Sequence, residues 1–453
     1  MRRELIELRI LPPLAIGRLG SSPDPMDNYD LVIRDPVGPR QIEPAETLRV
    51  DRKTGSVSRF TPKAPLRFKD RHGVRPVAPF LEVWARLKGE SKLRPLTVEL
   101  LRAAGLKPDS VSWRVQVANL KIFRRTAVEA DKIATDIRPF SDHKVHRLSG
   151  RCRNFLPRKT VSLGSVQYIL PSRTLPEIRF RFTPAGGKVY GLDPADNVYD
   201  SSKGTWQGQY SEPQDNTQGP AKGRLLTQPF QTFAGENKGG DKDSKLVSAG
   251  YIDDECDGFV EVEIRNRTGP MVRAFARIAS GPPAFAPDSM PVRTVGDELE
   301  QAMFGPRVNG RVTVKELREV VEIVRRAMET ACLMNAAQLN AGSLQPGSGM
   351  ARHDTKDWHR ALEPMFEPSV AETVAIASRN QRVLLGVESG SLVWFANALR
   401  DFDQVADLST EGRRKMPGLM RGSDGMHLAL TRRQVDKIRK VAAAGVRLMS
   451  DRR

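Results

Sequence analysis

Cysteine is scarce in this 453-residue sequence, which contains three: Cys152, Cys256 and Cys332. They are spaced too widely for a CxxC zinc motif, and three thiols in an otherwise ordinary composition do not make a disulfide framework. We therefore expect reduced thiols. The length is enough for one large domain or for two or more, each burying a core of its own.

Long apolar runs are also missing. Residues 1–20 start with basic side chains, but Glu4 and Glu7 interrupt the apolar segment and Pro12-Pro13 breaks it again. A signal peptide needs an uninterrupted apolar stretch at this point. We expect no signal peptide and no membrane span, and a protein that is either cytoplasmic or exported without a recognisable signal.

The sequence lacks the common catalytic motifs: it has no G-x-S-x-G elbow, Walker loop, H-E-x-x-H or dinucleotide-binding fingerprint. Histidine forms two clusters, which are His143 with His146, and His353 and His359 with Asp354 and Asp357. Either pair could present two ligands to zinc. Exposed polar turns produce such clusters more often than metal sites do, so we assign no metal.

Positive charge, by contrast, is abundant, with a formal net charge of +18. Residues 411–453 contain twelve Lys or Arg against four Asp or Glu. Such a region attracts anions non-specifically. Single-stranded nucleic acid also needs aromatic side chains for base stacking, and none follows Phe402. The composition thus suggests phosphate attraction without base recognition.

The hydrophobic pattern changes along the chain. Apolar residues alternate with polar ones in "VSWRVQVANLKIF" (111–123), and again in 260–264 and 272–278 around the turn "NRTGP", which predicts a strand and a hairpin. Residues 191–246 are rich in Gly, Asp, Asn, Ser and Gln and predict either a long ordered loop or a partly disordered insertion. Residues 1–310 are therefore expected to be a β-rich domain.

From about residue 311 the apolar period becomes helical. Three capping boxes start predicted helices: Thr313 with Glu316, Ser369 with Glu372, and Thr431 with Gln434. In the last of these, Leu430 is placed to pack against Val435. The sequence predicts an α+β fold in which the β-rich domain is followed by a mainly helical domain over residues 311–453.

The segment "DDECD" (253–257) could be a metal site, a redox site or an acidic turn. Calcium needs six or more oxygen ligands, and adjacent side chains of an extended segment point to opposite faces. The neighbouring acids also disfavour the thiolate of Cys256. We interpret the segment as a solvated turn before a strand.

Four segments together resemble, in the same order, those of a known family. They are "ELRILPPLAIGRLGSSPD" (7–24), "VSWRVQVANLKIF" (111–123), "GYIDDECDGFVEVEI" (250–264) continued by "RIASGPPAFAPDSMPVRTVGDELEQAMF" (277–304), and "MPGLMRGSDGMHLALTRRQ" (416–434). The family is that of L-lysine ε-oxidase and glycine oxidase, the LodA-like quinoproteins. On these segments the chain is identified as a member.

The resemblance implies oxidative deamination of an amino acid or amine, with release of ammonia and hydrogen peroxide. It implies a cysteine tryptophylquinone cofactor made from the protein's own side chains, a carboxylate that removes a carbon-bound proton, and a flavoprotein maturation partner. A quinone is needed because no ordinary side chain accepts two electrons from a C–H bond. A homo-oligomer is also compatible with the resemblance.

The cofactor residues implied by the family belong to the C-terminal part. That part contains one cysteine, Cys332, and two tryptophans, Trp358 and Trp394. We assign Cys332 and Trp394 to the quinone, with Trp358 as the other indole, and Glu329 to the acidic position before the cysteine. Two alternatives remain: a non-catalytic scaffold or binding protein that lacks the quinone, and an anion-binding or nucleic-acid-binding protein that uses the basic C-terminal region.

Overall fold

The computed structural model describes residues 4–191 apart from 35–39, 122, 127–128 and 153–159; short strands within 199–248; residues 251–333 apart from 267–268, 285–286 and 311; Gly386; and residues 430–450. The chain divides into two compact units, residues 1–30 with 43–285, and residues 31–42 with 286–453. Each unit has its own buried core.

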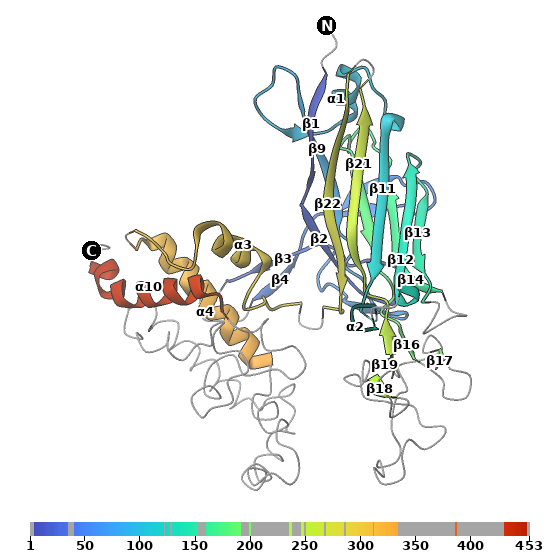
Figure 1. Ribbon diagram of the computed structural model, residues 1–453. Helices are drawn as coiled ribbons and strands as arrows, with labels where there is room; N and C mark the ends of the chain where they lie inside the picture. The colour runs from blue at the N-terminus through green and yellow to red at the C-terminus, as the bar shows by residue number, and fades with distance from the viewer. Residues whose placement is uncertain are drawn as a thin grey trace, which may run out of the picture. The chain divides into compact units, whose positions relative to one another are not determined.

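Two large sheets form the first unit, and alternation of buried and exposed residues marks most of their strands (Figure 1). One sheet has the order β1-β9-β15-β14-β13 with β10 paired to β9, and the other has the order β12-β11-β21-β22-β2. The strands of the first sheet are β1 (Leu5–Leu11), β9 (Phe80–Leu87), β10 (Arg94–Pro95), β13 (Val145–Gly150), β14 (Val161–Tyr168) and β15 (Arg179–Thr183). Those of the second are β2 (Leu14–Arg18), β11 (Val111–Asn119), β12 (Ile133–Phe140), β21 (Asp257–Arg265) and β22 (Met271–Gly281).

One hydrophobic core is shared by the two sheets. It contains Phe180 and Phe182 from β15 and Trp113 and Val262 from the other sheet, all fully buried. The ring of Trp113 packs against that of Phe180, with 4.6 Å between the ring centroids. Because alternate side chains of a strand point to opposite faces, each sheet contributes one apolar face to this core.

Shorter elements surround these sheets. The short strands are β3 (Tyr29–Val32), β4 (Gln41–Pro44), β5 (Thr47–Val50), β6 (Val57–Phe60), β7 (Lys69–Asp70), β8 (Gly73–Val74), β16 (Val189–Gly191), β17 (Tyr199–Asp200), β18 (Gly235–Asn237), β19 (Leu246–Ser248) and β20 (Tyr251–Asp253). The short helices are α1 (Val98–Ala103), η1 (Pro108–Ser110), α2 (Phe123–Thr126) and η2 (Glu129–Asp131). Strands β5 and β6 form a hairpin.

The second unit contains α3 (Val295–Phe304), α4 (Val314–Leu333) and α10 (Arg432–Ser450). Helices α4 and α10 bury one face each in a common core. Val292 also lies in this core, which explains why the second unit takes in residues 286–310, a segment that the sequence analysis assigned to the N-terminal part. No helix of the described residues is both long and apolar enough to span a bilayer.

Most of the expected elements appear where the sequence analysis placed them. The predicted strand is β11, and the predicted hairpin is formed by β21 and β22, which pair antiparallel. Of the two predicted capping boxes that lie in the described residues, that of Thr431 and Gln434 is confirmed by both of its hydrogen bonds, and in the other Glu316 accepts the Thr313 N–H at 2.8 Å. The β-rich N-terminal part is thus confirmed. The helix predicted at Ser369 and most of the loop predicted over 191–246 lie outside the described residues.

Candidate functional site

The acidic residue assigned before the cysteine, Glu329, lies on α4 and is held by an arginine from a distant segment. Arg40 Nε donates to Glu329 Oε1 at 2.7 Å, and the backbone N–H of Met290 donates to Oε2 at 3.1 Å. Arg40 also pairs with Glu322, one further residue of α4. The guanidinium thus ties residues 31–42 to this helix within the second unit.

Two opposing effects set the proton affinity of Glu329. Burial, and to a smaller extent the neighbouring Glu322 carboxylate, raise the pKa of Glu329. The Met290 N–H and the Arg40 charge lower it, but the pKa stays above its ordinary value. A carboxylate with a raised pKa is better suited to take a proton near neutral pH than an ordinary one. Both of its oxygens, however, are already engaged.

The other predicted cofactor residues are less fully described. Cys332 lies in α4, three residues after Glu329, so the two positions share one side of the helix. Its side chain, and the whole of Trp358 and Trp394, lie outside the described residues, as do His353, Asp354, Asp357 and His359. The assignment of Cys332, Trp394 and Trp358 to a quinone therefore stays a prediction.

The acidic segment 253–257 links β20 to β21, and it is not solvated throughout. Asp254 is completely buried, and its Oδ2 accepts the backbone N–H of Lys188 at 2.9 Å. Its Oδ1 has no hydrogen-bond partner among the described residues. Burial raises the pKa of Asp254 to about 7. The interpretation as a solvated turn was wrong at this residue.

A lysine neutralises the acids on either side of Asp254. Lys121 Nζ bonds both Asp253 and Glu255, and Asn119 Nδ2 donates to the Asp253 carbonyl oxygen at 2.9 Å. Burial alone would lower the pKa of Lys121, but the two carboxylates outweigh it and raise that pKa. Asn119 is the last residue of β11 and Lys121 follows two positions later, and the sequence analysis did not assign this role to either of them. Arg40 gave no local signal, because its partners lie almost 300 positions away in the sequence.

The Cys256 thiol is buried behind this turn. Its Sγ donates to the Leu163 carbonyl oxygen at 3.3 Å, and its backbone N–H donates to Ser280 Oγ at 2.8 Å. Burial and the adjacent carboxylates raise the pKa of the thiol to about 12. The expectation that Cys256 is a poor nucleophile is supported, with burial as the larger cause.

The two histidines of the first cluster, His143 and His146, interact with different groups. His143 Nδ1 lies 3.1 Å from the Tyr168 carbonyl oxygen, whereas His146 Nε2 lies 3.0 Å from Asp142 Oδ1 and its ring stacks on Phe140. Within the described part of the chain, no three His, Cys, Asp or Glu side chains come together as metal ligands.

Several basic residues of the C-terminal region pair within the second unit. On α10, Lys437 Nζ contacts Glu319 at 2.6 Å and Glu300 at 3.2 Å, and Arg433 Nε contacts Glu300 at 3.0 Å. Burial alone would lower the pKa of Lys437, but its hydrogen bonds to these carboxylates and their charges outweigh burial and raise that pKa. Lys437 and Arg433 are therefore already paired with carboxylates. Anion binding through residues 411–453 stays a prediction.

Comparison with known proteins finds similarity to solved structures alone. No family model matches the sequence, and no curated protein matches it. The chain is similar to a structure of the ε-lysine oxidase from Marinomonas mediterranea, with 13% identity over 97% of this chain and 61% of that one, at a TM-score of 0.42. A second structure of the L-Lys ε-oxidase from the same organism has 13% identity over 78% of this chain and 50% of that one, at a TM-score of 0.37.

A third similar structure is that of the Schiff base intermediate of the same oxidase with L-Lys. It has 14% identity over 71% of this chain and 44% of that one, at a TM-score of 0.36. The aligned part of this chain spans about half of the length of these oxidases. A likeness of this degree assigns no role to any residue of this chain.

Proposed function

We propose that this chain is a LodA-like quinoprotein amino-acid oxidase, which deaminates an amino acid or amine and releases ammonia and hydrogen peroxide. The observation that carries the proposal is the position of the family-like segments. Strands β2, β11, β21 and β22, which contain parts of three of them, belong to one sheet in the order β11-β21-β22-β2. Segments far apart in the sequence therefore build one shared structure.

In this proposal Cys332 and Trp394 hold the quinone, with Trp358 as the other indole. The quinone would supply a two-electron acceptor, which side chains alone do not provide. Glu329, one turn before Cys332 on α4, takes the proton from the substrate carbon. To do so it has to release one of its hydrogen bonds to Arg40 and Met290. The substrate and a flavoprotein maturation partner belong to the same proposal.

The covalent link gives a test that does not need a substrate. Of the three cysteines in the sequence, one would be consumed, so the denatured and reduced protein should show two reactive thiols instead of three. Redox-cycling stain should remain on the denatured chain, and its intact mass should differ from that of the unmodified sequence. Cys332→Ala should abolish the stain. Three free thiols and an unmodified mass would remove the oxidase proposal.

The role of Glu329 has a matched control on the same helix. Glu329→Gln should lower turnover by about a hundredfold or more, because general-base groups contribute this much. Glu322→Gln, which changes the other carboxylate bound to Arg40, should leave turnover within about threefold. Equal effects of the two substitutions would indicate that the ion pair with Arg40 matters only for structure.

A second candidate is a non-catalytic scaffold with the same fold. It is favoured by one observation: both carboxylate oxygens of Glu329 already bind partners, as in a structural ion pair. The same thiol count and mass measurement separate the two, since the scaffold keeps all three thiols.

A further inference from the structure

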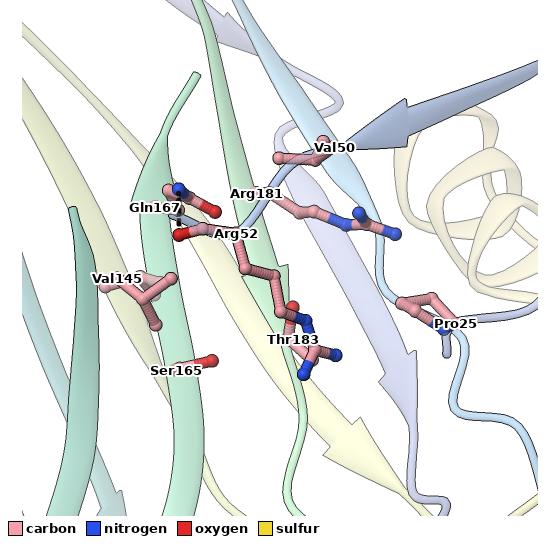
Figure 2. Close-up of a pocket in the computed structure, with 9 residues that line it drawn as sticks. Pro25, Val50, Arg52, Val145, Ser165, Gln167, Arg181 and Thr183 are labelled. Carbon is pink, nitrogen blue, oxygen red and sulfur yellow. Dashed lines mark hydrogen bonds between the residues drawn. The ribbon is translucent and has the colours of Figure 1, made fainter. Parts of the chain in front are cut away.

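Three adjoining hollows of the first unit share one side chain, Arg181 on β15. They lie among β5, β14, β15 and the segment 24–29, and the two larger ones have volumes of about 490 and 560 Å³. The smallest shares Arg52 with one of the larger ones and adds Gln167 and Thr183 to the lining (Figure 2). In Figure 2 the side chains of Arg52 and Arg181 both extend toward the side on which Pro25 lies. We refer to these three hollows together as the arginine cavity.

Some of the charges that line the arginine cavity neutralise each other. Arg75 pairs with Asp27 at 2.8 Å and Arg59 with Glu46 at 3.5 Å, while Arg179 pairs with two glutamates outside the cavity. Asp70 accepts hydrogen bonds from Ser22 and from the His72 backbone N–H. The ion pairs leave little net charge in the lining, whereas Asp70 keeps its negative charge because both of its donors are neutral.

Four arginines of the lining have no carboxylate partner among the described residues: Arg49, Arg52, Arg67 and Arg181. Two carboxylates of the lining, Asp24 and Asp70, form no ion pair among the described residues, and Asp24 is exposed. Arg49 lies over the ring of Phe60 at 4.1 Å, and Arg52 donates to the Pro23 carbonyl oxygen. The cavity therefore has an excess of positive charge.

Arg181 is the most costly of these charges. Its Nε is buried without a hydrogen-bond partner among the described residues, and its guanidinium lies over the ring of Phe80 at 4.8 Å. Burial, with a smaller contribution from the charge of Arg52, lowers its pKa to about 10, so it stays charged at neutral pH. Arg181 is half-buried. A partly buried charge without a counter-ion is unfavourable, and a bound anion would offset this cost.

The residues of the lining also indicate the chemical class of the ligand. Guanidinium groups match phosphate oxygens in pairs, and several uncompensated arginines favour an anion with two charges. Apolar groups, including Tyr29, Leu48 and Phe80, line the same space, so the phosphate can be attached to an apolar body. We propose that the arginine cavity binds a small organic phosphate, whose phosphate group lies between Arg52 and Arg181.

The proposal is tested with phenyl phosphate as the probe and uncharged phenol as its counterpart, by calorimetry of the full chain at about 0.15 M salt, where surface charges are screened. One phenyl phosphate should bind per chain, and phenol should not. Arg181→Gln and Arg52→Gln should each weaken binding about tenfold or more, because each removes hydrogen bonds to a charged group. Arg138→Gln, at an exposed arginine of β12 outside the cavity, is the matched control and should change binding less than about twofold.

Several results would overturn the proposal: absence of binding, equal loss in all three variants, or no loss in the two cavity variants. The proposal would also be overturned in favour of nucleic acid if phenyl phosphate does not bind, but a short single-stranded DNA binds and loses affinity in the Arg52→Gln and Arg181→Gln variants. If Arg181→Gln lowers the unfolding temperature, the binding affinity of Arg52→Gln is used to test the proposal. Arg52 is exposed, so its substitution is expected to leave the fold intact. All residues of the cavity lie in the first unit and none belongs to the proposed quinone, so either proposal can fail alone.

Discussion

Asp254 shows how far the environment of one side chain can depart from what its neighbours in sequence suggest. It lies in sequence among three other acidic side chains and one cysteine, a composition that predicts an exposed segment. In the structure the backbone of Lys188, 66 residues earlier, covers it and donates to its carboxylate. No local pattern predicts such a contact, because burial of one side of a turn depends on which distant segment crosses it.

The buried carboxyl of Asp254 should make stability depend on pH. Its pKa is raised from 3.8 to about 7, so the folded protein binds the proton more tightly than the unfolded chain does. Its contribution is therefore present below about pH 4 and lost as the pH rises to about 7. Asp254→Asn should gain up to about 4 kcal/mol relative to the wild type between pH 4 and pH 8. Denaturant unfolding at the two pH values measures this.

The control for this experiment is Asp257→Asn, three residues later, where the side chain is exposed. It should change the free energy of unfolding by a similar amount at both pH values. Parallel pH profiles of the wild type and Asp254→Asn would show that the carboxyl of Asp254 is already ionised in the folded protein at acidic pH.

Among the elements, the pairing of β11 with β21 depends on a residue without a side chain. A Cβ added at Gly258 would lie 2.0 Å from the carbonyl oxygen of Gln116 and 2.7 Å from the Cα of Val117. Both are backbone atoms, so they cannot move aside without shifting the strand. Gly258→Ala should cost about 3 kcal/mol of unfolding free energy, as for overpacking.

Gly186 provides the matched control, since an added Cβ there meets no atom within 4 Å. Gly186→Ala should change the free energy of unfolding by less than about 1 kcal/mol. A similar loss in both variants would contradict the steric explanation, because an added Cβ meets backbone atoms at Gly258 and no atom at Gly186.

The start of α10 depends on a buried cap. Thr431 Oγ1 accepts the Gln434 N–H at 3.1 Å, and the Gln434 side chain accepts the Thr431 N–H at 2.8 Å. Thr431→Ala should lower the free energy of unfolding by about 1 to 2 kcal/mol, the usual cost of a lost N-cap. Arg439→Ala, at an exposed position of the same helix, should have less than half of this effect. Denaturant unfolding compares them, and equal effects would contradict a role for the cap.

These elements also show what the sequence could predict. Strand β11, the hairpin of β21 and β22 and the caps of α4 and α10 were predictable, because a two-residue alternation or a capping box lies within a few positions. Helix α3 was missed. Thr294 and Asp297 cap it reciprocally, and this Thr-x-x-Asp signal was present in the sequence. Its large apolar residues, such as Leu299 and Met303, are exposed in the structure.

At the scale of the candidate site, prediction from sequence stops at the residue types. Glu329 could be singled out by its place before Cys332, but its ion pair with Arg40 could not, since the chain between them forms most of the first unit. The arginine cavity is likewise assembled from several separate segments. Long-range contacts of this kind carry no periodic signal.

For the whole molecule, the two separate cores imply two unfolding events. The first core includes Val262 and the second Val324, and both side chains are fully buried. Because each unit buries its own apolar residues, each can unfold as a cooperative whole, so calorimetry should show two transitions. Val262→Ala should lower one transition by a few degrees, at a cost of about 2 kcal/mol, and Val324→Ala should lower the other. A single transition that both substitutions shift equally would mean that the units unfold together. Residues 31–42 would explain such coupling, because they belong to the second unit although they lie within the sequence of the first.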